Sequence, residues 1–373
     1  MKKNAGRRKK LQMVTFIALG WALCAGILFI VQYFFVLDLI VMKRVSGSYD
    51  PRTDFIGSVV LGVIDGFIAG YIMIFRLGSR YRKKSFAFGI IYSGLFFIVI
   101  YLGFGICGLF LMDFIYFVFQ MDFRAALTTS WNNVLFNMKV PSFFINMSVW
   151  AFLTCCTQFI IQVSDKFGPG ILWKFLTGKY YHPREEERIF MFLDLKSSTT
   201  IAEKTGSNKF FRLLKEIFSD ITEPIINSRG EIYQYVGDEV VVTWPSKTGL
   251  SDNNCLLCFY RIKQALEKRT KYYLEQYGVV PFFKAGIHIG EATVGEIGII
   301  KKDIVFSGDV LNTTSRIQGE CNKHNVNIIL SSALLQRMPI NGDYKKIPLG
   351  EIQLRGKEEK LSLVTLEPAQ SSR

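Results

Sequence analysis

Histidine and lysine are absent from the four longest apolar runs of this sequence. The chain has only three histidines among its 373 residues, His182, His288 and His324, and all of them follow those runs. A haem held by two histidines needs imidazoles, and a retinal Schiff base needs a lysine. Both cofactors are therefore disfavoured within the apolar half of the chain.

The seven cysteines lack the pattern of a zinc site. Cys255 and Cys258 form a pair in a segment with helical periodicity, but neither a second pair nor a nearby histidine completes a set of four ligands. We therefore expect thiols packed in a core, in a reducing cytosol. Repeats and low-complexity stretches are also absent.

Acidic residues are scarce relative to basic ones, 31 against 45, which gives a net charge of +14. Much of the basic excess lies beside the apolar runs, in MKKNAGRRKK before the first and RLGSRYRKK after the second. Anionic lipid headgroups are the simplest partners for basic residues at such positions. The charge therefore predicts contact with a lipid bilayer, and no nucleic acid partner is expected.

Four apolar runs reach the roughly 20 residues that a helix needs to cross a bilayer. They are Leu11–Leu37, Phe55–Phe75, Phe86–Leu111 and Ser142–Val163. The first is too long for a secretory signal and ends without a cleavage pattern, so we interpret it as an anchor. Since basic residues resist translocation, their positions predict a multi-pass protein of the cell membrane with both termini in the cytoplasm.

The second apolar run combines regularly spaced glycines with an acidic residue. Gly62, Gly66 and Gly70 recur every four residues, which predicts a flat face for close helix packing. Asp65 lies among them, and an intramembrane carboxylate by default indicates a functional site. At a packed glycine face it can also simply hydrogen-bond a neighbouring helix, and we favour packing over sensing here.

Strand and helix patterns alternate in the second half of the chain. A connector at 164–186 leads to a domain at 187–368, which opens with a buried strand, RIFMFLDL, and continues with a hairpin, EIYQYVGDEVVVTW. We expect an α+β sheet of the ferredoxin-like or palm type with helices on one face. The chain is thus predicted to be an all-α membrane bundle of four transmembrane helices at 1–163, followed by this α+β domain.

Two aspartates stand where the predicted strands end. Asp194 closes the first strand and is followed by a polar turn with Ser197, Ser198 and Thr199, whose backbone N–H groups can meet phosphate oxygens. Asp238 is placed at the tip of the hairpin. Either aspartate alone is more typical of a turn or cap, but two carboxylates from neighbouring strands can hold two divalent cations.

A third signal lies on the helix that follows FSGD. Asn312 and Arg316 are four residues apart, so both side chains leave from one face of that helix. Such a face can bind a sugar oxygen and neutralise a pentavalent phosphorus. Taken alone, the pair would more simply be part of a solvated helix surface.

These segments together resemble a known catalytic domain. FLDLKSSTT, YQYVGDEV, AGIHIGEATVGEIG, FSGDVLNTTSRI and LRGK occur in the order and approximate spacing of the class III adenylyl and guanylyl cyclases. The similarity covers about Glu187–Leu366. Five ordered motifs make a specific signal, whereas GDE alone would be weak.

The resemblance implies a homodimer, wrapped head to tail, with active sites at its interface. Two metal ions, Mg²⁺ or Mn²⁺, would be held by one protomer, and a transition-state pair would come from the other. The metal ligands correspond to Asp194, the carbonyl of Leu195 and Asp238. The transition-state pair corresponds to Asn312 and Arg316, and the triphosphate-binding cation to Arg355, helped by Lys357. One chain carries both halves, so a two-fold dimer would complete two sites.

Two positions that read the base depart from the usual residues of this family. Adenylyl cyclases usually carry Lys at the first position and Asp or Thr at the second, guanylyl cyclases carry Glu at the first, and this chain has Gln234 and Val305. An amide can both donate and accept, so it suits adenine or guanine. Gln234 can also be a structural hydrogen bond across the hairpin or a sign of lost base reading.

We expect an adenylyl cyclase that converts ATP into cyclic AMP and pyrophosphate by attack of the ribose 3′-oxygen on the α-phosphorus. The alternatives are a guanylyl cyclase acting on GTP and a non-catalytic, nucleotide-binding membrane receptor. A diguanylate cyclase fits less well, because the sequence before and after Asp238 differs from the signature of that family. A channel or transporter is disfavoured because the runs carry few polar groups.

Overall fold

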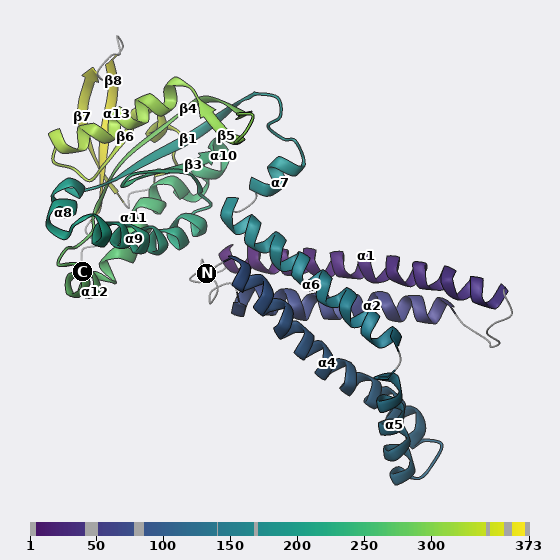
Figure 1. The fold of residues 1–373 in the computed structure, drawn as a ribbon. Helices are drawn as coiled ribbons and strands as arrows, with labels where there is room; N and C mark the ends of the chain where they lie inside the picture. The colour runs from purple at the N-terminus through teal and green to yellow at the C-terminus, as the bar shows by residue number, and fades with distance from the viewer. Residues whose placement is uncertain are drawn as a thin grey trace. The chain divides into compact units, whose positions relative to one another are not determined.

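The computed structural model describes residues 5–41, 51–77, 86–139, 141–167, 171–340, 344–353 and 360–369. The chain divides into two compact units, one of Arg7–Phe167 and one that consists mainly of Gly168–Arg373. The first unit is helical, and the second is built on one sheet with helices (Figure 1).

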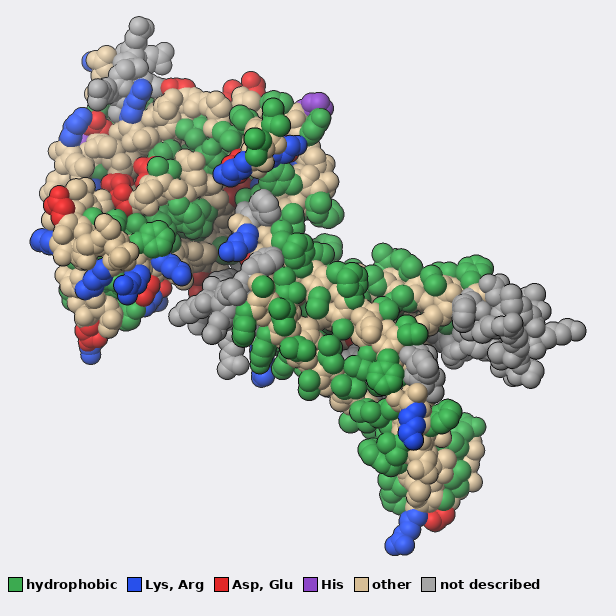
Figure 2. All heavy atoms as spheres, in the orientation of Figure 1, with side chains coloured by type: hydrophobic (Ala, Val, Ile, Leu, Met, Phe, Trp, Pro, Cys, Tyr) green, Lys and Arg blue, Asp and Glu red, His purple; other side chains and the backbone are tan. Residues whose placement is uncertain are grey.

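The helical unit is strongly apolar on its surface. Its helices are α1 (Ala5–Val41), α2 (Pro51–Tyr71), which continues as the π-helical segment η1 (Ile72–Leu77), α4 (Phe86–Val118), α5 (Phe123–Asn137) and α6 (Pro141–Phe167). Figure 2 shows hydrophobic side chains over much of these helices. Such a surface suits a lipid environment better than water.

Three segments of the described residues are long and apolar enough to cross a membrane: Lys10–Phe34, Phe55–Arg76 and Phe143–Lys166. They confirm three of the four predicted apolar spans as helices of sufficient length. In α4 the described apolar segment, Ala87–Ile100, is shorter, although the helix itself continues for 33 residues.

The glycines of α2 pack against α1, as their spacing predicts. A Cβ atom on Gly62 would lie 2.8 Å from Cβ of Ala25, and one on Gly66 would lie 2.8 Å from Cα of Ala18. Only hydrogen at these positions allows the two backbones to approach so closely. The prediction of a flat packing face is therefore confirmed.

The second unit contains a sheet in the order β2-β3-β1-β4-β6-β8-β7, with β5 paired to β4. The strands are β1 (Arg184–Leu195), β2 (Glu231–Val236), β3 (Glu239–Pro245), β4 (Phe283–Ile297), β5 (Asp303–Ser307), β6 (Ile328–Ser331), β7 (Tyr344–Gln353) and β8 (Lys360–Pro368). The helical segments are α7 (Ile171–Leu176), α8 (Ser198–Thr205), α9 (Ser207–Asn227), α10 (Ser246–Leu250), η2 (Ser251–Asn253), α11 (Asn254–Glu267), α12 (Thr270–Tyr277), α13 (Asp309–Lys323) and α14 (Ser332–Gln336).

Strand β1 lies in the middle of the sheet and is buried on both faces. Ile189, Met191 and Leu193 pack with α9 and α11 on one face, whereas Phe190 and Phe192 belong to a second cluster with residues of β5 and α13. This explains why the strand is a continuous apolar run rather than an alternating one.

The prediction of helices on one face of the sheet is therefore wrong. Helix α13 packs against the face opposite α9 and α11, and it comes so close to β4 that a Cβ atom on Gly286 would lie 2.8 Å from the carbonyl oxygen of Thr314. A continuous apolar strand needs packing partners on both faces of the sheet, and Gly286 of β4 leaves room for α13 on the second face.

Cys255 and Cys258 are fully buried in α11, which confirms the prediction of core thiols. Burial raises the pKa of Cys255 to about 12. Among the described residues, no group of three histidine, cysteine or acidic side chains is arranged to hold a metal.

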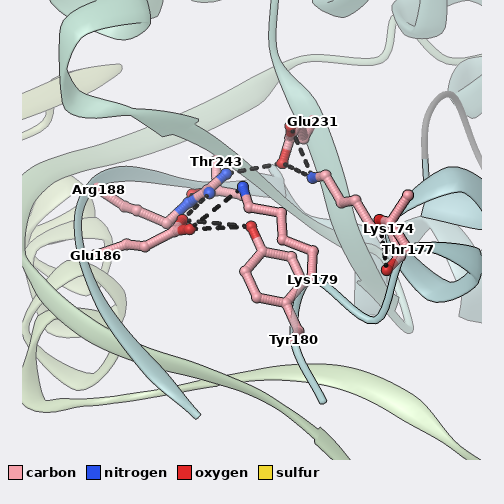
Figure 3. Close-up of polar contacts among 8 residues, drawn as sticks. All are labelled: Lys174, Thr177, Lys179, Tyr180, Glu186, Arg188, Glu231 and Thr243. Carbon is pink, nitrogen blue, oxygen red and sulfur yellow. Dashed lines mark hydrogen bonds and ion pairs between the residues drawn. The ribbon is translucent and has the colours of Figure 1, made fainter. Parts of the chain in front are cut away.

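The connector before β1 is held to the sheet by a network of charges around the buried Arg188 (Figure 3). Arg188 of β1 is 1% exposed, and its guanidinium donates to Glu186 at 2.8 Å and to Glu231 at 2.7 Å. Lys174 of α7 donates to the same Glu231 at 3.0 Å, and the hydroxyl of Tyr180 donates to Glu186 at 3.1 Å. The connector thereby contacts the first residue of β2 and the fifth residue of β1.

Candidate active site

The sheet brings the two predicted metal-binding aspartates to the same edge. β3 pairs with β1 in antiparallel register, so Leu193 lies opposite Val240 and Asp194 follows one residue later. The hairpin between β2 and β3 turns at Gly237 and Asp238, and Gly237 has a φ of 62°, a conformation that glycine adopts without strain. Asp238 is thus held beside the end of β1.

Three carboxylates crowd together at this edge. Burial raises the pKa of Asp194, and the neighbouring carboxylate of Asp238 raises it further. Burial, followed by the charges of Asp194 and Asp238, raises the pKa of Glu239 to about 7. Close carboxylates that are partly buried repel one another, so the cluster holds more negative charge than its surroundings neutralise.

The carboxylate cluster has the features of a binding site for divalent cations. Oδ2 of Asp238 is buried and, among the described residues, has no hydrogen-bond partner. A buried acceptor of this kind needs a donor or a cation. Magnesium is usually held by one or two carboxylates, with substrate phosphates and water completing its shell, so two aspartates are sufficient without a third protein ligand.

A buried lysine beside Asp194 escaped the sequence analysis. Lys284 of β4 is opposite Asp194 in the register and is 6% exposed. Its ammonium donates to Oδ1 of Asn322, and its charge opposes the rise in the pKa of Asp194. The signal in the sequence was a lone lysine inside the apolar strand FFKAGIHIG.

Helix α13 also contacts Asp194 directly. The side chain of Gln318 lies close enough to Asp194 to oppose the rise in the pKa of that carboxyl, and Asn322, which holds Lys284, lies four residues further on the same face of the helix. Gln318 is a second residue that the sequence analysis missed. Both amides anchor α13 to the strand ends that carry the carboxylates.

Asn312 and Arg316 lie elsewhere on α13. Asn312 is exposed and Arg316 is half-buried, whereas the face toward the sheet is buried. Among the described residues, neither side chain forms a hydrogen bond or ion pair with Asp194 or Asp238. A single chain therefore does not bring the predicted transition-state pair and the predicted metal ligands together.

The polar turn after β1 forms the start of α8. Ser197 precedes the helix with a φ of 59°, which is uncommon for a residue with a side chain. The N–H of Ile201 donates to the carbonyl oxygen of Ser197 at 3.0 Å. The N–H groups of Ser198 and Thr199 come before that bond, so they have no acceptor within the helix, as in any first turn.

The residues predicted to read the base lie on β2 and β5. Gln234 is exposed at a bulge of β2, opposite Val241, and Val305 is half-buried on β5. The strands meet nearby, because the N–H of Phe306 donates to the hydroxyl of Tyr233 at 3.3 Å.

The structure also bears on the predictions for Gln234, for the two triphosphate-binding cations and for the carbonyl of Leu195. Among the described residues, the side chain of Gln234 makes no hydrogen bond across the hairpin, so its interpretation as a structural bond is not supported. Arg355 and Lys357 lie outside the described residues. The carbonyl of Leu195 lies at the end of β1, where that strand pairs with Phe283.

Comparisons with known proteins identify the same domain. Residues 180–367, half of the chain, match the family described as the adenylate and guanylate cyclase catalytic domain. Adenylate cyclase 2 of Rhizobium meliloti (strain 1021) is 33% identical over 223 residues, which cover 60% of this chain and 61% of that protein. Adenylate cyclase of Anabaena cylindrica is 23% identical over 180 residues, which cover 46% of this chain and 35% of that protein.

The match is thus partial on both sides: this chain covers less than two thirds of the length of these relatives. Among solved structures, a bacterial light-regulated adenylyl cyclase aligns with a TM-score of 0.51 and 18% identity, over 61% of this chain and 66% of that one. That likeness shows a shared fold.

Proposed function

This chain belongs to the adenylate and guanylate cyclase catalytic domain family, and from that premise we propose that it is a membrane-bound adenylyl cyclase. The reaction is the conversion of ATP into cyclic AMP and pyrophosphate. The observation that carries the proposal is the pair Asp194 and Asp238, which the fold holds at one edge with a buried, unpartnered carboxylate oxygen. The relatives named above are adenylate cyclases, which favours ATP over GTP.

The carboxylates of Asp194 and Asp238, with the carbonyl of Leu195, would hold two divalent cations, Mg²⁺ or Mn²⁺. When bound, these ions lower the pKa of the ribose 3′-hydroxyl and neutralise the phosphates. Glu239 adds negative charge, and Lys284 limits the total charge next to Asp194. The protein's own part is to place the 3′-oxygen in line with the α-phosphorus, and no side-chain base is needed.

The remaining groups act on the phosphates and the base. The N–H groups of the turn at Ser197, Ser198 and Thr199, at the start of α8, would bind phosphate oxygens of the substrate. Arg355 and Lys357 add cations for the triphosphate. Gln234 and Val305 contact the base, and an amide at the first position is compatible with adenine or guanine. A guanylyl cyclase therefore remains the second candidate.

The active unit is a homodimer in this proposal. Asn312 and Arg316 form the outward face of α13, and neither reaches the aspartates of its own chain. A second copy, related by a two-fold axis, would supply them across the interface, where Arg316 neutralises charge that develops on the α-phosphorus. Each dimer then contains two complete sites.

The helical unit is the membrane anchor. We infer four spans, because α4 continues without a break for 33 residues and its sequence is as apolar as that of the three qualifying helices. The basic flanks favour an orientation with both termini and the cyclase domain in the cytoplasm, at the cell membrane.

The proposal is tested by incubating the full-length protein in detergent with ATP or GTP and either Mg²⁺ or Mn²⁺. Cyclic AMP from ATP is expected, with a loss of about a hundredfold to a thousandfold in Asp194→Ala and little change in Asp303→Ala, which removes an exposed carboxylate at the start of β5. Cyclic GMP as the main product would support the second candidate. No cyclic nucleotide from either substrate, by a folded protein, would show that the domain is not a cyclase.

A further inference from the structure

A small cavity lies among the helices of the membrane unit. Its volume is about 50 Å³, and α1, α2, α4 and α6 each contribute to its wall. Trp21, Asp65, Phe97, Trp150 and Thr154 are among the residues that line it. A single water molecule needs roughly 10–15 Å³ on this scale, so the cavity has room for a group of several heavy atoms.

Asp65 lies beside the glycine face that packs α2 against α1. Gly62 and Gly66 form that contact, and Asp65 is about 60° around the helix from Gly62 and about 100° from Gly66. Among the described residues, its carboxylate has no hydrogen bond and no ion pair. A carboxylate in a membrane helix is costly, and one that pairs with no protein group is expected to have another partner.

Two tryptophans form an aromatic wall beside this carboxylate. The rings of Trp21 and Trp150 have centroids 5.6 Å apart and are inclined at 40°. The indole N–H of Trp21 donates to Oγ1 of Thr157 at 3.0 Å, which fixes the orientation of that ring. The hydroxyl of Thr154 donates to the carbonyl oxygen of Trp150 at 2.8 Å, which leaves the hydroxyl oxygen available as an acceptor in the cavity wall.

Two buried amides follow Thr154 on the same face of α6, outside the residues that line the cavity. Gln158, one turn beyond Thr154, is 2% exposed and its amide oxygen has no hydrogen-bond partner among the described residues. The amide nitrogen of Gln162, one turn further, is also unpaired. Buried amides without partners are rare unless they serve a ligand or water.

We propose that this cavity binds a small ammonium-type cation. The cavity wall combines a carboxylate, a hydroxyl acceptor and two indole rings, which are the kinds of group that recognise a protonated amine. A hard metal ion such as Mg²⁺ or Ca²⁺ would need about six oxygen ligands, and this wall offers mostly rings and aliphatic carbon. Binding involves helices that are distant from the catalytic carboxylates in sequence, so it does not depend on the proposed reaction.

The test uses the full-length protein in neutral detergent, titrated with methylammonium chloride at constant ionic strength. A saturable rise in the unfolding temperature and a change in tryptophan fluorescence are expected, and methanol and sodium chloride should produce neither. The apparent affinity should fall at least tenfold in Asp65→Asn and should also fall in Thr154→Val. Asp113→Asn, which neutralises a carboxylate of α4 that does not line the cavity, is the matched control and should bind normally.

An equal response to sodium, or an unchanged affinity in Asp65→Asn, would overturn the proposal. The absence of any saturable response in the wild-type protein would overturn it as well. Asp65→Asn keeps the shape of the side chain and removes a charge, so we expect it to fold. If it does not, Thr154→Val tests the same cavity through loss of the hydroxyl acceptor, and an unchanged affinity in that variant would overturn the proposal.

Discussion

Replacing Arg188 with methionine tests how the connector is joined to the catalytic sheet. The guanidinium bonds to Glu186, Glu231 and Thr243, and it lies 4.7 Å above the centroid of the Phe306 ring. Removing one partner of a buried ion pair costs about 3–5 kcal/mol. Because both glutamates are partly exposed and water can reach them, we expect about 2–3 kcal/mol.

For a unit of roughly 200 residues, that loss lowers the unfolding temperature by about 4–12 °C. The assay is thermal unfolding of the full-length protein, followed by circular dichroism. Arg337→Met is the matched control, since Arg337 pairs with Glu187 of the same strand but its side chain is 45% exposed. Exposed pairs contribute about 1 kcal/mol or less, so the control should unfold within a few degrees of the wild type.

The pH dependence gives a second criterion. Burial raises the pKa of Glu231, but the charges of Arg188 and Lys174 outweigh this effect and hold the pKa below its usual value. A carboxyl group whose pKa is lower in the folded state stabilises the fold above its ordinary pKa of about 4.3 and loses that contribution as the pH falls through the folded value. The difference between wild type and Arg188→Met should thus be full at pH 7 and shrink below about pH 4. A variant that is no less stable than Arg337→Met, or a difference independent of pH, would refute the reasoning.

Three further predictions concern the residues proposed to bind metal and base. Since charge on Glu239 is unfavourable without metal, Glu239→Gln should raise the metal-free stability by about 1 kcal/mol at pH 8 and leave it nearly unchanged at pH 5, and thermal unfolding in a chelator at both values checks this. Lys284→Met removes the cation that opposes the raised pKa of Asp194, so the acidic limb of the pH–rate profile should move to higher pH, whereas Lys284→Arg should keep it near the wild-type position. Gln234→Glu replaces a side chain that both donates and accepts with one that only accepts, and kcat/KM for GTP relative to ATP should rise about tenfold or more; an unchanged ratio would remove Gln234 from base recognition.

The position of the carboxylates could be predicted because local rules determine it. An apolar strand that ends in Asp194 and a two-residue turn at Gly237 and Asp238 are both visible in the sequence, and antiparallel pairing of neighbouring strands brings them together. The packing of α13 on the second face of the sheet was not predicted, although the unbroken apolar character of β1 and the glycine at position 286 both indicated it.

Buried charges were harder to predict. Lys284 and Arg188 stand in strands where a lone cation is more typically solvated. Only the folded structure shows that Lys284 lies opposite Asp194 and that Arg188 forms ion pairs with Glu186 and Glu231. Asp65 was grouped with the glycines because it is adjacent to them in sequence. Asp65 instead lies beside the glycine face and lines a cavity whose other walls come from helices far apart in the chain.

The central claim is that each active site takes Asp194 from one protomer and Arg316 from the other. The most direct measurement mixes purified full-length Asp194→Ala with Arg316→Ala and follows cyclic AMP formation from ATP. Each variant alone should be inactive, and the equimolar mixture should recover up to about a quarter of wild-type activity, because half of the dimers are mixed and each has one intact site of two. No recovery in a mixture shown to form mixed dimers would contradict the account.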